Sequence, residues 1–281
     1  MKTSITMYSF HRAARQRGMT VEQFIRTAGA MGVDGVDLLS YFWQDEAAEV
    51  PQVAGWLKDA GLELAAYAVG NNFIKGGEAD FAAGVKTVTD GIEMAARLGA
   101  PAMRVFGGNL PEGMTVDEAL DRAARGLREC LPLAEAKGVV LAVENHGGMP
   151  GTAEELRRVI EAVDSPFVRA CVDIGNFLSA GDEAGPAVKA TADLAAHVHV
   201  KDFKMFDADS EEGRKAARAD WRLEACAVGE GVVPQAACYQ ALKDAGYTGF
   251  LSLEYEGVND DEQAGVEQSI AAMRAALEQV T

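Results

Sequence analysis

Charged and histidine side chains follow short apolar runs in the second half of the chain, at positions where they could act together. Residues 139–144 alternate in character, so Leu141 and Val143 share one face of an extended segment and Glu144 lies on the other. His146 continues the polar parity two residues later. The same alternation in three later runs selects a further set of inward-facing residues: Cys171, Asp173, His197, His199, Lys201, Ser252 and Glu254. Ionisable groups from four runs are therefore expected to converge at one place.

Three carboxylates and one imidazole stand at or near the C-terminal ends of these runs and form the expected metal site: Glu144, Asp173, His199 and Glu254. Bare carboxylates at close quarters would repel one another and have raised pKa values, whereas a divalent cation removes the repulsion. Such ligands suit Mn²⁺, Co²⁺, Fe²⁺, Mg²⁺ or Zn²⁺, and the missing thiolate argues against a structural zinc. We expect one ion, with Mn²⁺ as the first choice. The alternative is a buried Asp173–His199 salt bridge with both glutamates solvated at the rim.

These residues must be positioned by strands, and eight short segments have the composition of buried strands. They are Ile5–Tyr8, Gly35–Leu39, Leu62–Val69, Ala102–Phe106, Val139–Glu144, Val168–Asp173, His197–Val200 and Phe250–Glu254. Segments with helical spacing lie between them. Three of these helices begin with a capping box, in which a threonine and a side chain three residues later satisfy free backbone N–H groups. The boxes pair Thr20 with Gln23, Thr115 with Glu118, and Thr152 with Glu155.

Strands and helices alternate along the whole chain, which predicts parallel strands joined by right-handed crossovers. Eight such units in 281 residues are the number that closes a (β/α)8 TIM barrel. A doubly wound open sheet is the competing architecture, but the turn at residues 8–12 lacks the G-x-G-x-x-G phosphate loop of one such class. No linker or low-complexity tract interrupts the series. Residues 1–281 are therefore expected to form a single α/β domain.

The longest stretch without a clear pattern runs from Asp202 to Val232 and includes the charged piece 207–220. A segment of this length in a compact domain is usually a functional lid or flap, or is disordered. Trp221 and Arg222 lie within it, and we expect them to close over a substrate.

Several other inward-facing residues have two interpretations. Arg104 and the aromatic Tyr8 are expected to bind substrate, although Arg104 could instead neutralise the acid cluster, and Asp37 is its expected partner. His197 lies one layer deeper than His199, so it is expected to be a core histidine with a satisfied hydrogen bond.

The composition excludes several classes of protein. Acidic residues number 43 against 26 basic ones, a formal charge of −17, so binding to nucleic acid or to an anionic membrane surface is not expected. No apolar run approaches the roughly 18 to 20 residues of a membrane span, and residues 1–5 show no signal-peptide pattern, which predicts a cytoplasmic protein. The four cysteines are far apart, and we expect reduced, mostly buried thiols at Cys130, Cys171, Cys226 and Cys238.

Six short motifs occur in a fixed order along the chain. They are residues 102–108 (AMRVFGG), 141–148 (LAVENHGG), 172–176 (VDIGN), 197–202 (HVHVKD), 229–231 (GEG) and 251–255 (LSLEY). In this order and spacing they resemble the xylose isomerase-like barrel superfamily, which includes ketose 3-epimerases, inosose dehydratase and endonuclease IV. The resemblance spans nearly the whole chain. It implies that the four residues selected by parity are the metal ligands.

The sequence departs from that family three residues after Asp173, where ketose 3-epimerases and endonuclease IV commonly have a histidine. Asn176 stands there instead; asparagine is a poor ligand but can hydrogen-bond a substrate or a group beside the metal. A multi-zinc nuclease site is therefore not expected, and Asn176 is assigned to substrate binding. The segment 229–231 places an acid where such barrels often bind phosphate, which favours an unphosphorylated substrate.

Together these features predict a sugar or cyclitol isomerase or epimerase whose partner is a small molecule. Our hypothesis is that Glu144 and Glu254 remove and return a proton through an enediolate. Because a metal-bound glutamate is a weak base, His146 or Lys201 could perform one transfer; alternatively His146 orients Glu144 and Lys201 forms an ion pair.

Two other functions stay open. One is a lyase on a keto-sugar or 3-keto-glycoside, of the inosose dehydratase or deglycosidase type, and the other is a non-catalytic barrel subunit. The sequence does not name the sugar or the native metal, and it leaves a homo-oligomer open.

Overall fold

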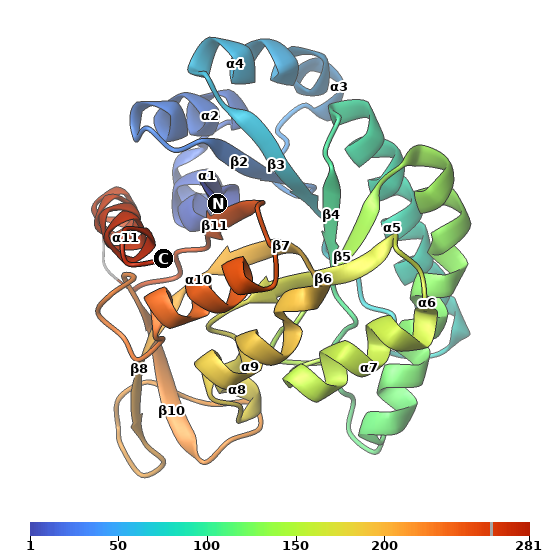
Figure 1. Ribbon diagram of the computed structural model, residues 1–281. Helices are drawn as coiled ribbons and strands as arrows, with labels where there is room; N and C mark the ends of the chain where they lie inside the picture. The colour runs from blue at the N-terminus through green and yellow to red at the C-terminus, as the bar shows by residue number, and fades with distance from the viewer. Residues whose placement is uncertain (259–260) are drawn as a thin grey trace.

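Eight parallel strands close on themselves to form a barrel, and helices surround it on the outside (Figure 1). The structure, a computed structural model, describes residues 1–258 and 261–281. Around the barrel the strands follow the order β1-β11-β7-β6-β5-β4-β3-β2. Their bounds are β1 Lys2–Thr6, β2 Gly35–Leu39, β3 Glu63–Ala68, β4 Ala102–Val105, β5 Val140–Glu144, β6 Val168–Asp173, β7 Ala195–Val200 and β11 Phe250–Leu253. The predicted single-domain (β/α)8 barrel is confirmed.

The outer layer consists of helices that bury apolar faces against the strands. The α-helices are α1 His11–Arg17, α2 Val21–Ala30, α3 Glu46–Glu49, α4 Val53–Ala60, α5 Glu78–Leu98, α6 Val116–Lys137, α7 Ala153–Val163, α8 Phe177–Ala180, α9 Ala184–Thr191, α10 Gln235–Asp244 and α11 Glu262–Leu277. Short 3-10 turns are η1 Met7–Phe10, η2 Val50–Gln52 and η3 Ala192–Leu194. The three predicted capping boxes are present at the starts of α2, α6 and α7. They satisfy backbone N–H groups that a helix start leaves free.

Alternation along the strands separates the two faces of the barrel, as predicted. The outward parity contributes to the large core under the helices, whereas Ala102, Ala142 and Cys171 form a small cluster of their own inside the barrel. Strand register places Asp173 beside His199, and His199 beside Ser252. Polar side chains from adjacent strands therefore meet above this small apolar cluster, at the C-terminal end of the barrel.

The first strand lies earlier than predicted. It ends at Thr6 rather than Tyr8, because the Thr6 hydroxyl accepts a hydrogen bond from the Tyr8 backbone N–H at 3.3 Å and caps the turn η1. Thr3, Ser4 and Thr6 made the true strand look polar in the sequence, although all three are buried. Tyr8 consequently stands on a turn at the mouth and not on a strand.

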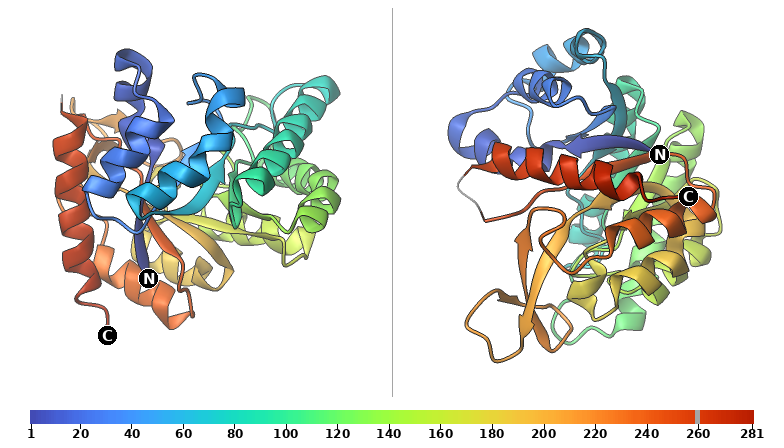
Figure 2. Two further views of the ribbon diagram at one scale, coloured as in Figure 1. Left: turned by 90° about the horizontal axis from the view of Figure 1, so that it is seen from above. Right: turned by 60° about the vertical axis from the view of Figure 1, so that its left-hand side comes forward.

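The stretch from Asp202 to Val232 is not irregular, contrary to the sequence-based expectation. It contains an antiparallel sheet of order β8-β10-β9, formed by β8 Asp202–Asp207, β9 Arg214–Lys215 and β10 Trp221–Cys226. Apolar and polar residues alternate along β10, a pattern typical of a half-buried strand that the charged turns around it obscured. This mouth sheet, β8-β10-β9, projects from the barrel (Figure 2).

The mouth sheet is fastened at its base by a single carboxylate. Asp202 Oδ1 accepts the backbone N–H groups of Phe203 and Val233 at 2.9 and 3.0 Å, and Oδ2 accepts those of Gly229 and Gly231 at 2.9 and 3.1 Å. One side chain thus ties the first residues of the segment to its last. These hydrogen bonds also hold the segment 229–231 against Asp202.

A second fastening joins the mouth sheet to α7. Arg218, between β9 and β10, donates two hydrogen bonds to Glu155 at 2.6 and 2.7 Å. Glu155 also accepts the backbone N–H groups of Gly151 and Thr152 at 2.9 and 3.1 Å. Although burial raises the pKa of Glu155, these donors bring it below the ordinary value.

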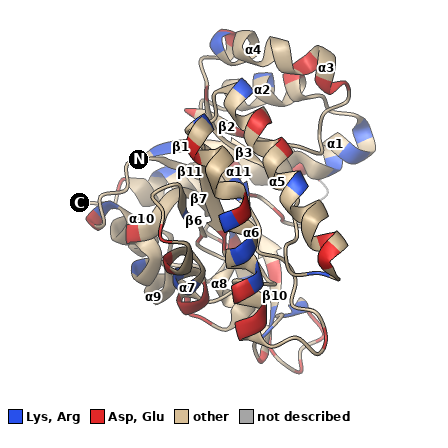
Figure 3. Ribbon diagram, turned by 90° about the vertical axis from the view of Figure 1, so that its right-hand side faces the viewer, with Lys and Arg blue, Asp and Glu red and all other residues tan. Residues whose placement is uncertain are grey.

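The surface and thiol chemistry agree with the composition. Acidic and basic positions are interspersed along α6 (Figure 3), and Arg125 pairs with Glu129 one turn further on. In the part of the chain that the structure describes, no helix is both long and apolar enough to cross a membrane.

All four cysteines are buried and unbridged, as expected, and burial raises the pKa of Cys130 to about 12.

We expect Glu155→Gln to lower the free energy of unfolding by about 1.5–3 kcal/mol at neutral pH, because it removes a charge-assisted contact while keeping a capping side chain. Glu155 has a depressed pKa in the folded state, so its contribution is complete above the unfolded-state value of about 4.3 and is lost as pH falls through the folded-state pKa. Thermal melts of both proteins from pH 7 to pH 3 measure the difference.

The matched control is Glu154→Gln, which changes an exposed carboxylate on the same helical turn. Its melting temperature should follow that of the unmodified protein. A gap between Glu155→Gln and the unmodified protein that is the same at every pH would contradict the ion-pair explanation.

Candidate metal centre

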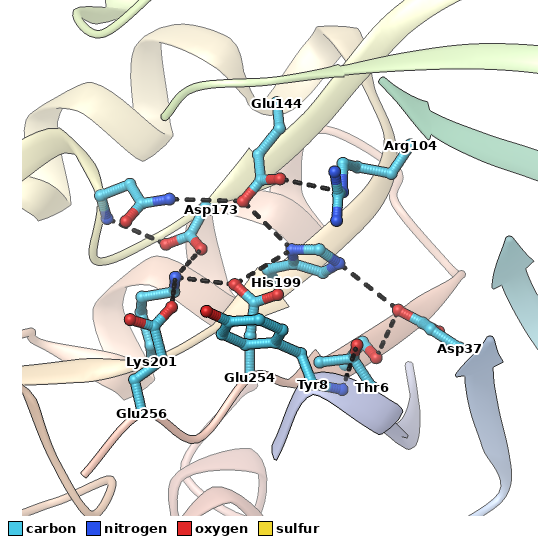
Figure 4. A network of polar contacts seen from close by, with 12 residues as sticks. Thr6, Tyr8, Asp37, Arg104, Glu144, Asp173, His199, Lys201, Glu254 and Glu256 are labelled. Carbon is cyan, nitrogen blue, oxygen red and sulfur yellow. Dashed lines mark hydrogen bonds and ion pairs between the residues drawn. The ribbon is translucent and has the colours of Figure 1, made fainter. Parts of the chain in front are cut away.

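Four side chains from four adjacent strands meet at the C-terminal end of the barrel. Glu144, Asp173, His199 and Glu254 each offer one ligand atom, and these atoms lie within 4.8 Å of one another. Glu144 and Asp173 end β5 and β6, His199 lies in β7, and Glu254 follows β11. All four are buried, with at most 5% of the residue exposed. Figure 4 shows them directed into one space.

The imidazole of His199 links the two glutamates. Its Nδ1 lies 3.3 Å from Glu144 Oε1 and 3.8 Å from Glu254 Oε2. Asn176 Nδ2 donates to Glu144 Oε1 at 3.3 Å, so Asn176 contacts a carboxylate of the cluster. Burial raises the pKa of Glu144, but the charges of His199 and Arg104 outweigh that effect and hold it below the ordinary value.

Two buried cations face the acidic cluster without balancing it. They form ion pairs of 2.7–3.1 Å with four carboxylates: Arg104 with Glu144, and Lys201 with Asp173, Glu254 and Glu256. When the imidazole is neutral, as it must be to bind a metal, and all four carboxylates are ionised, four carboxylates against two cations leave two negative charges. One divalent cation would bring that sum to zero.

Asp173 combines deep burial with nearby negative charge. Burial raises its pKa to about 7; Lys201 opposes the rise, whereas Glu144 and Glu254 add to it. Its Oδ1 accepts two backbone N–H groups at 2.9 Å, but Asp173 Oδ2 and Glu144 Oε2 are buried without a well-directed hydrogen bond from any described residue. Oxygen atoms left in this state, beside an imidazole, fit a divalent cation.

Below His199, Asp37 on β2 organises a second layer of polar contacts. Asp37 Oδ2 accepts hydrogen bonds from His197 Nε2 at 2.7 Å and Ser252 Oγ at 2.8 Å, and it lies 3.4 Å from His199 Nε2. The expected role of His197 as a core histidine with a satisfied hydrogen bond is confirmed. Since Nε2 of His199 faces Asp37, Nδ1 is turned toward the glutamates. Asp37 therefore orients the imidazole, as carboxylates beside metal-binding histidines do.

Arg104 pairs with Glu144 and not with Asp37, which corrects the expected partnership. Its Nη1 donates to the Val69 carbonyl at 2.8 Å, and its guanidinium lies 4.0 Å from the centre of the Phe106 ring. Asp37 is already engaged by His197, so the two side chains find separate partners. Arg104 is only 2% exposed, yet it borders the cavity above the cluster.

This cavity has a volume of about 560 Å³, a size that suits a small molecule. Among the residues assigned to catalysis or substrate binding, these line it: Tyr8, Arg104, Glu144, His146, Asn176 and Glu254. His146 is exposed there, with its ring against Phe106 at a centroid distance of 4.8 Å. Lys201 is not among the lining residues; its Nζ pairs with Glu254 and Glu256, which do line the cavity.

Trp221 and Arg222 are not among the residues lining this cavity, contrary to the expectation that they close over a substrate. Trp221 Nε1 donates to the Leu178 carbonyl at 2.9 Å and fastens the mouth sheet to α8. Arg222 donates to the carbonyls of Glu212 and Gly213 at 2.7–3.1 Å and holds the turn before β9. Both side chains support the mouth sheet, whereas other residues of that sheet and its turns reach the cavity: Phe203, Arg214, Lys215, Ala216, Ala217 and Leu223.

Several cavity residues were missed by the sequence analysis, and four of them carry polar or charged groups that a substrate would meet. Arg15 on α1 and Tyr41 after β2 line the mouth on the side of the first strands. Their place soon after strand ends is a signal that could have found them, because strand-end loops build the active face of such barrels. Arg214 and Lys215 lie on β9, inside the segment for which the sequence predicted no regular element.

Residues 25–276 match the model of the family described as xylose isomerase-like TIM barrel. Among curated relatives, inosose dehydratase of Clostridium perfringens is 27% identical over 143 residues, which is 50% of this chain and 48% of that protein. The matched region spans about half the length of such relatives.

Solved structures extend the likeness over the whole fold. IolI protein with a bound zinc atom has a TM-score of 0.82 at 14% identity, covering 100% of this chain and 99% of that one. A D-tagatose 3-epimerase-like protein has a TM-score of 0.78 at 19% identity, with 100% and 98% covered. At these identities the structural likeness establishes the fold, and the family model covers the greater part of the sequence. The chain belongs to the xylose isomerase-like TIM barrel family.

Proposed function

We propose that this protein is a divalent-metal-dependent enzyme that removes and returns a proton on a carbon atom of a sugar or cyclitol. The observation that carries the proposal is the buried cluster of three carboxylates and one imidazole within 4.8 Å, with negative charge in excess of its cationic partners. The cavity above it suits a small molecule. Similarity to an inosose dehydratase and to a D-tagatose 3-epimerase-like protein supports a sugar or cyclitol as the substrate class.

The proposed ligands are Glu144, Asp173, His199 and Glu254, and Mn²⁺ is our first choice of ion. A divalent cation bound there would polarise a carbonyl and lower the barrier to proton removal from the adjacent carbon. The zinc in the similar IolI structure supports a divalent cation in this fold. Asn176 stays outside the proposed ligand set because its amide nitrogen donates to Glu144.

The two glutamates are proposed to exchange the substrate proton. Both line the cavity, and they lie on either side of His199 (Figure 4). Arg104 and Asn176 hold Glu144 in one orientation, whereas Lys201 Nζ lies 2.7 Å from Glu254 Oε2. A carboxylate held in place is positioned for proton transfer at a defined face of the substrate, and a positioned base contributes about 10² to 10⁴ in rate.

Two further groups are proposed to assist. His146 is exposed at the cavity wall and could carry a proton between a glutamate and solvent. Lys201 holds Asp173, Glu254 and Glu256 together and could stabilise negative charge that develops on the substrate. Tyr8 and Arg104 border the space that the sugar would occupy.

The fate of the proton distinguishes three outcomes of the same first step. Return to the opposite face gives an epimer, and return to the neighbouring carbon gives an isomer. Expulsion of a group from the next carbon gives an elimination product, which is the reaction of a lyase. An isomerase or epimerase is our leading proposal, and the similarity to inosose dehydratase favours the lyase as the second candidate.

The experiment incubates the purified protein with Mn²⁺ in D₂O and a panel of ketoses, inososes and 3-keto-glycosides. We expect deuterium at a carbon next to the carbonyl, detected by mass spectrometry and NMR. An isomerase product gains only deuterium, whereas a lyase product loses water or an aglycone. Tight Mn²⁺ binding without exchange or product on any compound would contradict an enzymatic role, and equal exchange after chelation would contradict the metal.

Replacing Glu254 by Gln should lower the deuterium exchange rate by about 10²- to 10⁴-fold, because it removes a proposed base and ligand. Glu256→Gln is the matched control, since Glu256 also borders the cavity and contacts Lys201 at 2.9 Å but lies outside the ligand set. Equal losses in both variants would show that the effect comes from the Lys201 network and not from Glu254 itself.

We expect Asp37→Asn to weaken Mn²⁺ binding by about 10- to 100-fold, because the imidazole of His199 loses the charged partner that orients it. Calorimetric titration measures the affinity, and a thermal melt without metal reports folding. Ser252→Ala removes the neighbouring hydrogen bond to the same Asp37 oxygen and should change the affinity less. A fully retained affinity in a folded Asp37→Asn protein would refute the orienting role.

A further inference from the structure

Three cations stand at the outer part of the cavity in an otherwise acidic protein. Arg15 lies on α1, and Arg214 and Lys215 form β9; all three are exposed and line the cavity above the metal centre. The chain as a whole has a formal charge of −17, and the carboxylates that line the same cavity, Glu144, Glu254 and Glu256, are paired with Arg104 and Lys201.

These cations lack the partners that other basic residues nearby have. On the same segment, Lys204 pairs with Glu224, Arg218 with Glu155, and Arg222 donates to backbone carbonyls. Among the described residues no carboxylate pairs with Arg15, Arg214 or Lys215. The acidic residues of the adjoining turn, 207–212, do not border the cavity.

Arg214 and Lys215 are successive residues of a supported strand, and although their side chains leave opposite faces of it, both residues border the cavity. Arg214 and Lys215 pair with Leu223 and Arg222 of β10 in register. Gly213 precedes them at a φ of +70°, a conformation that favours glycine, and Arg222 binds its carbonyl oxygen. On the other side, Arg15 extends over the rings of Tyr41 and Phe42 at 5.9 Å each.

The buried charges at the metal centre do not neutralise the three rim cations, Arg15, Arg214 and Lys215. Arg104 and Lys201 are already committed to the buried carboxylates, and a divalent cation would cancel the remaining negative charge. The field of the three rim cations then acts on whatever enters the outer part of the cavity.

Backbone amides, which bind phosphate in many barrels, are occupied here. The N–H groups of Gly229 and Gly231 donate to Asp202, and Glu230 accepts a hydrogen bond from Gln268. An anion at this mouth would therefore be bound by side chains. This differs from the sequence-based preference for an unphosphorylated substrate, which considered only the segment 229–231.

We propose that Arg15, Arg214 and Lys215 form a subsite for an anionic substituent, a carboxylate or a phosphate monoester, at the end of the substrate remote from the metal centre. The inference rests on the proposed function and narrows its substrate class to acidic sugars. Arg and Lys bind both groups through charge-assisted hydrogen bonds.

The test compares three ketoses that differ only at C6: D-fructose, D-fructuronate and D-fructose 6-phosphate. Calorimetric titration at low ionic strength, with Mn²⁺ present, measures each dissociation constant. We expect at least one anionic ketose to bind about tenfold or more tightly than D-fructose. The compound with the larger preference identifies the substituent as a carboxylate or a phosphate.

Two variants on different elements locate the preference. Arg214→Gln with Lys215→Gln, and separately Arg15→Gln, should each reduce it about tenfold. The control is Arg97→Gln with Lys189→Gln, which removes two cations of the helical layer and should preserve the preference. A thermal melt confirms that each variant is folded.

Equal affinity for the neutral and anionic ketoses, or a preference retained in both the mouth-sheet and the Arg15 variants, overturns the subsite. The readout is binding, so it does not depend on turnover. Anion preference without deuterium exchange on any compound would support the subsite and reject the catalytic proposal. Exchange on D-fructose without anion preference would do the reverse.

Discussion

Repulsion among carboxylates that cannot reach water is the constraint on which the mouth of this barrel depends. Parallel strands bring their C-terminal ends to one opening, and Glu144, Asp173 and Glu254 are forced together there with little exposure. Buried charge of one sign is stable only beside compensating charge. Arg104 and Lys201 supply part of that compensation; burial raises the pKa of Asp173 to about 7, and the nearby charges of Glu144 and Glu254 add to the rise. A site of this kind favours a dication over water.

The barrel holds these mutually repelling carboxylates in a defined geometry. Strands, not loops, carry or immediately precede the clustered residues, and a layer below them orients His199 through Asp37. Support from beneath matters because a site held on rigid elements keeps its geometry when solvent or substrate exchanges above it. The mouth sheet, by contrast, is attached through Asp202 and Glu155 at its edges.

The sequence predicts those parts of the site that depend on a pattern within one strand, and not those that depend on contacts between distant strands. Alternation within each strand assigned Glu144, Asp173, His199 and Glu254 to one side, because a residue's parity depends only on its own strand. The partner of Asp37 could not be found in this way, since β2 approaches His197 of β7 only after the barrel has closed. The sequence could not predict the side-chain directions in the mouth sheet either. Trp221 and Arg222 donate to backbone carbonyls, whereas Arg214 and Lys215 line the cavity.

The arrangement of the cavity explains why one first step, removal of a proton, is compatible with several different products. Epimerisation, isomerisation and elimination all begin with loss of a proton next to a carbonyl, and in our proposal the buried cluster carries out that first step in each of them. The second step also depends on which group stands near the neighbouring carbon, and His146, Tyr8 and residues of the mouth sheet line the same cavity. Fold therefore cannot select among the three reactions. In our proposal the selection depends on side chains at the rim, which would hold the substrate by its remote end and present its reacting carbon to one glutamate or the other.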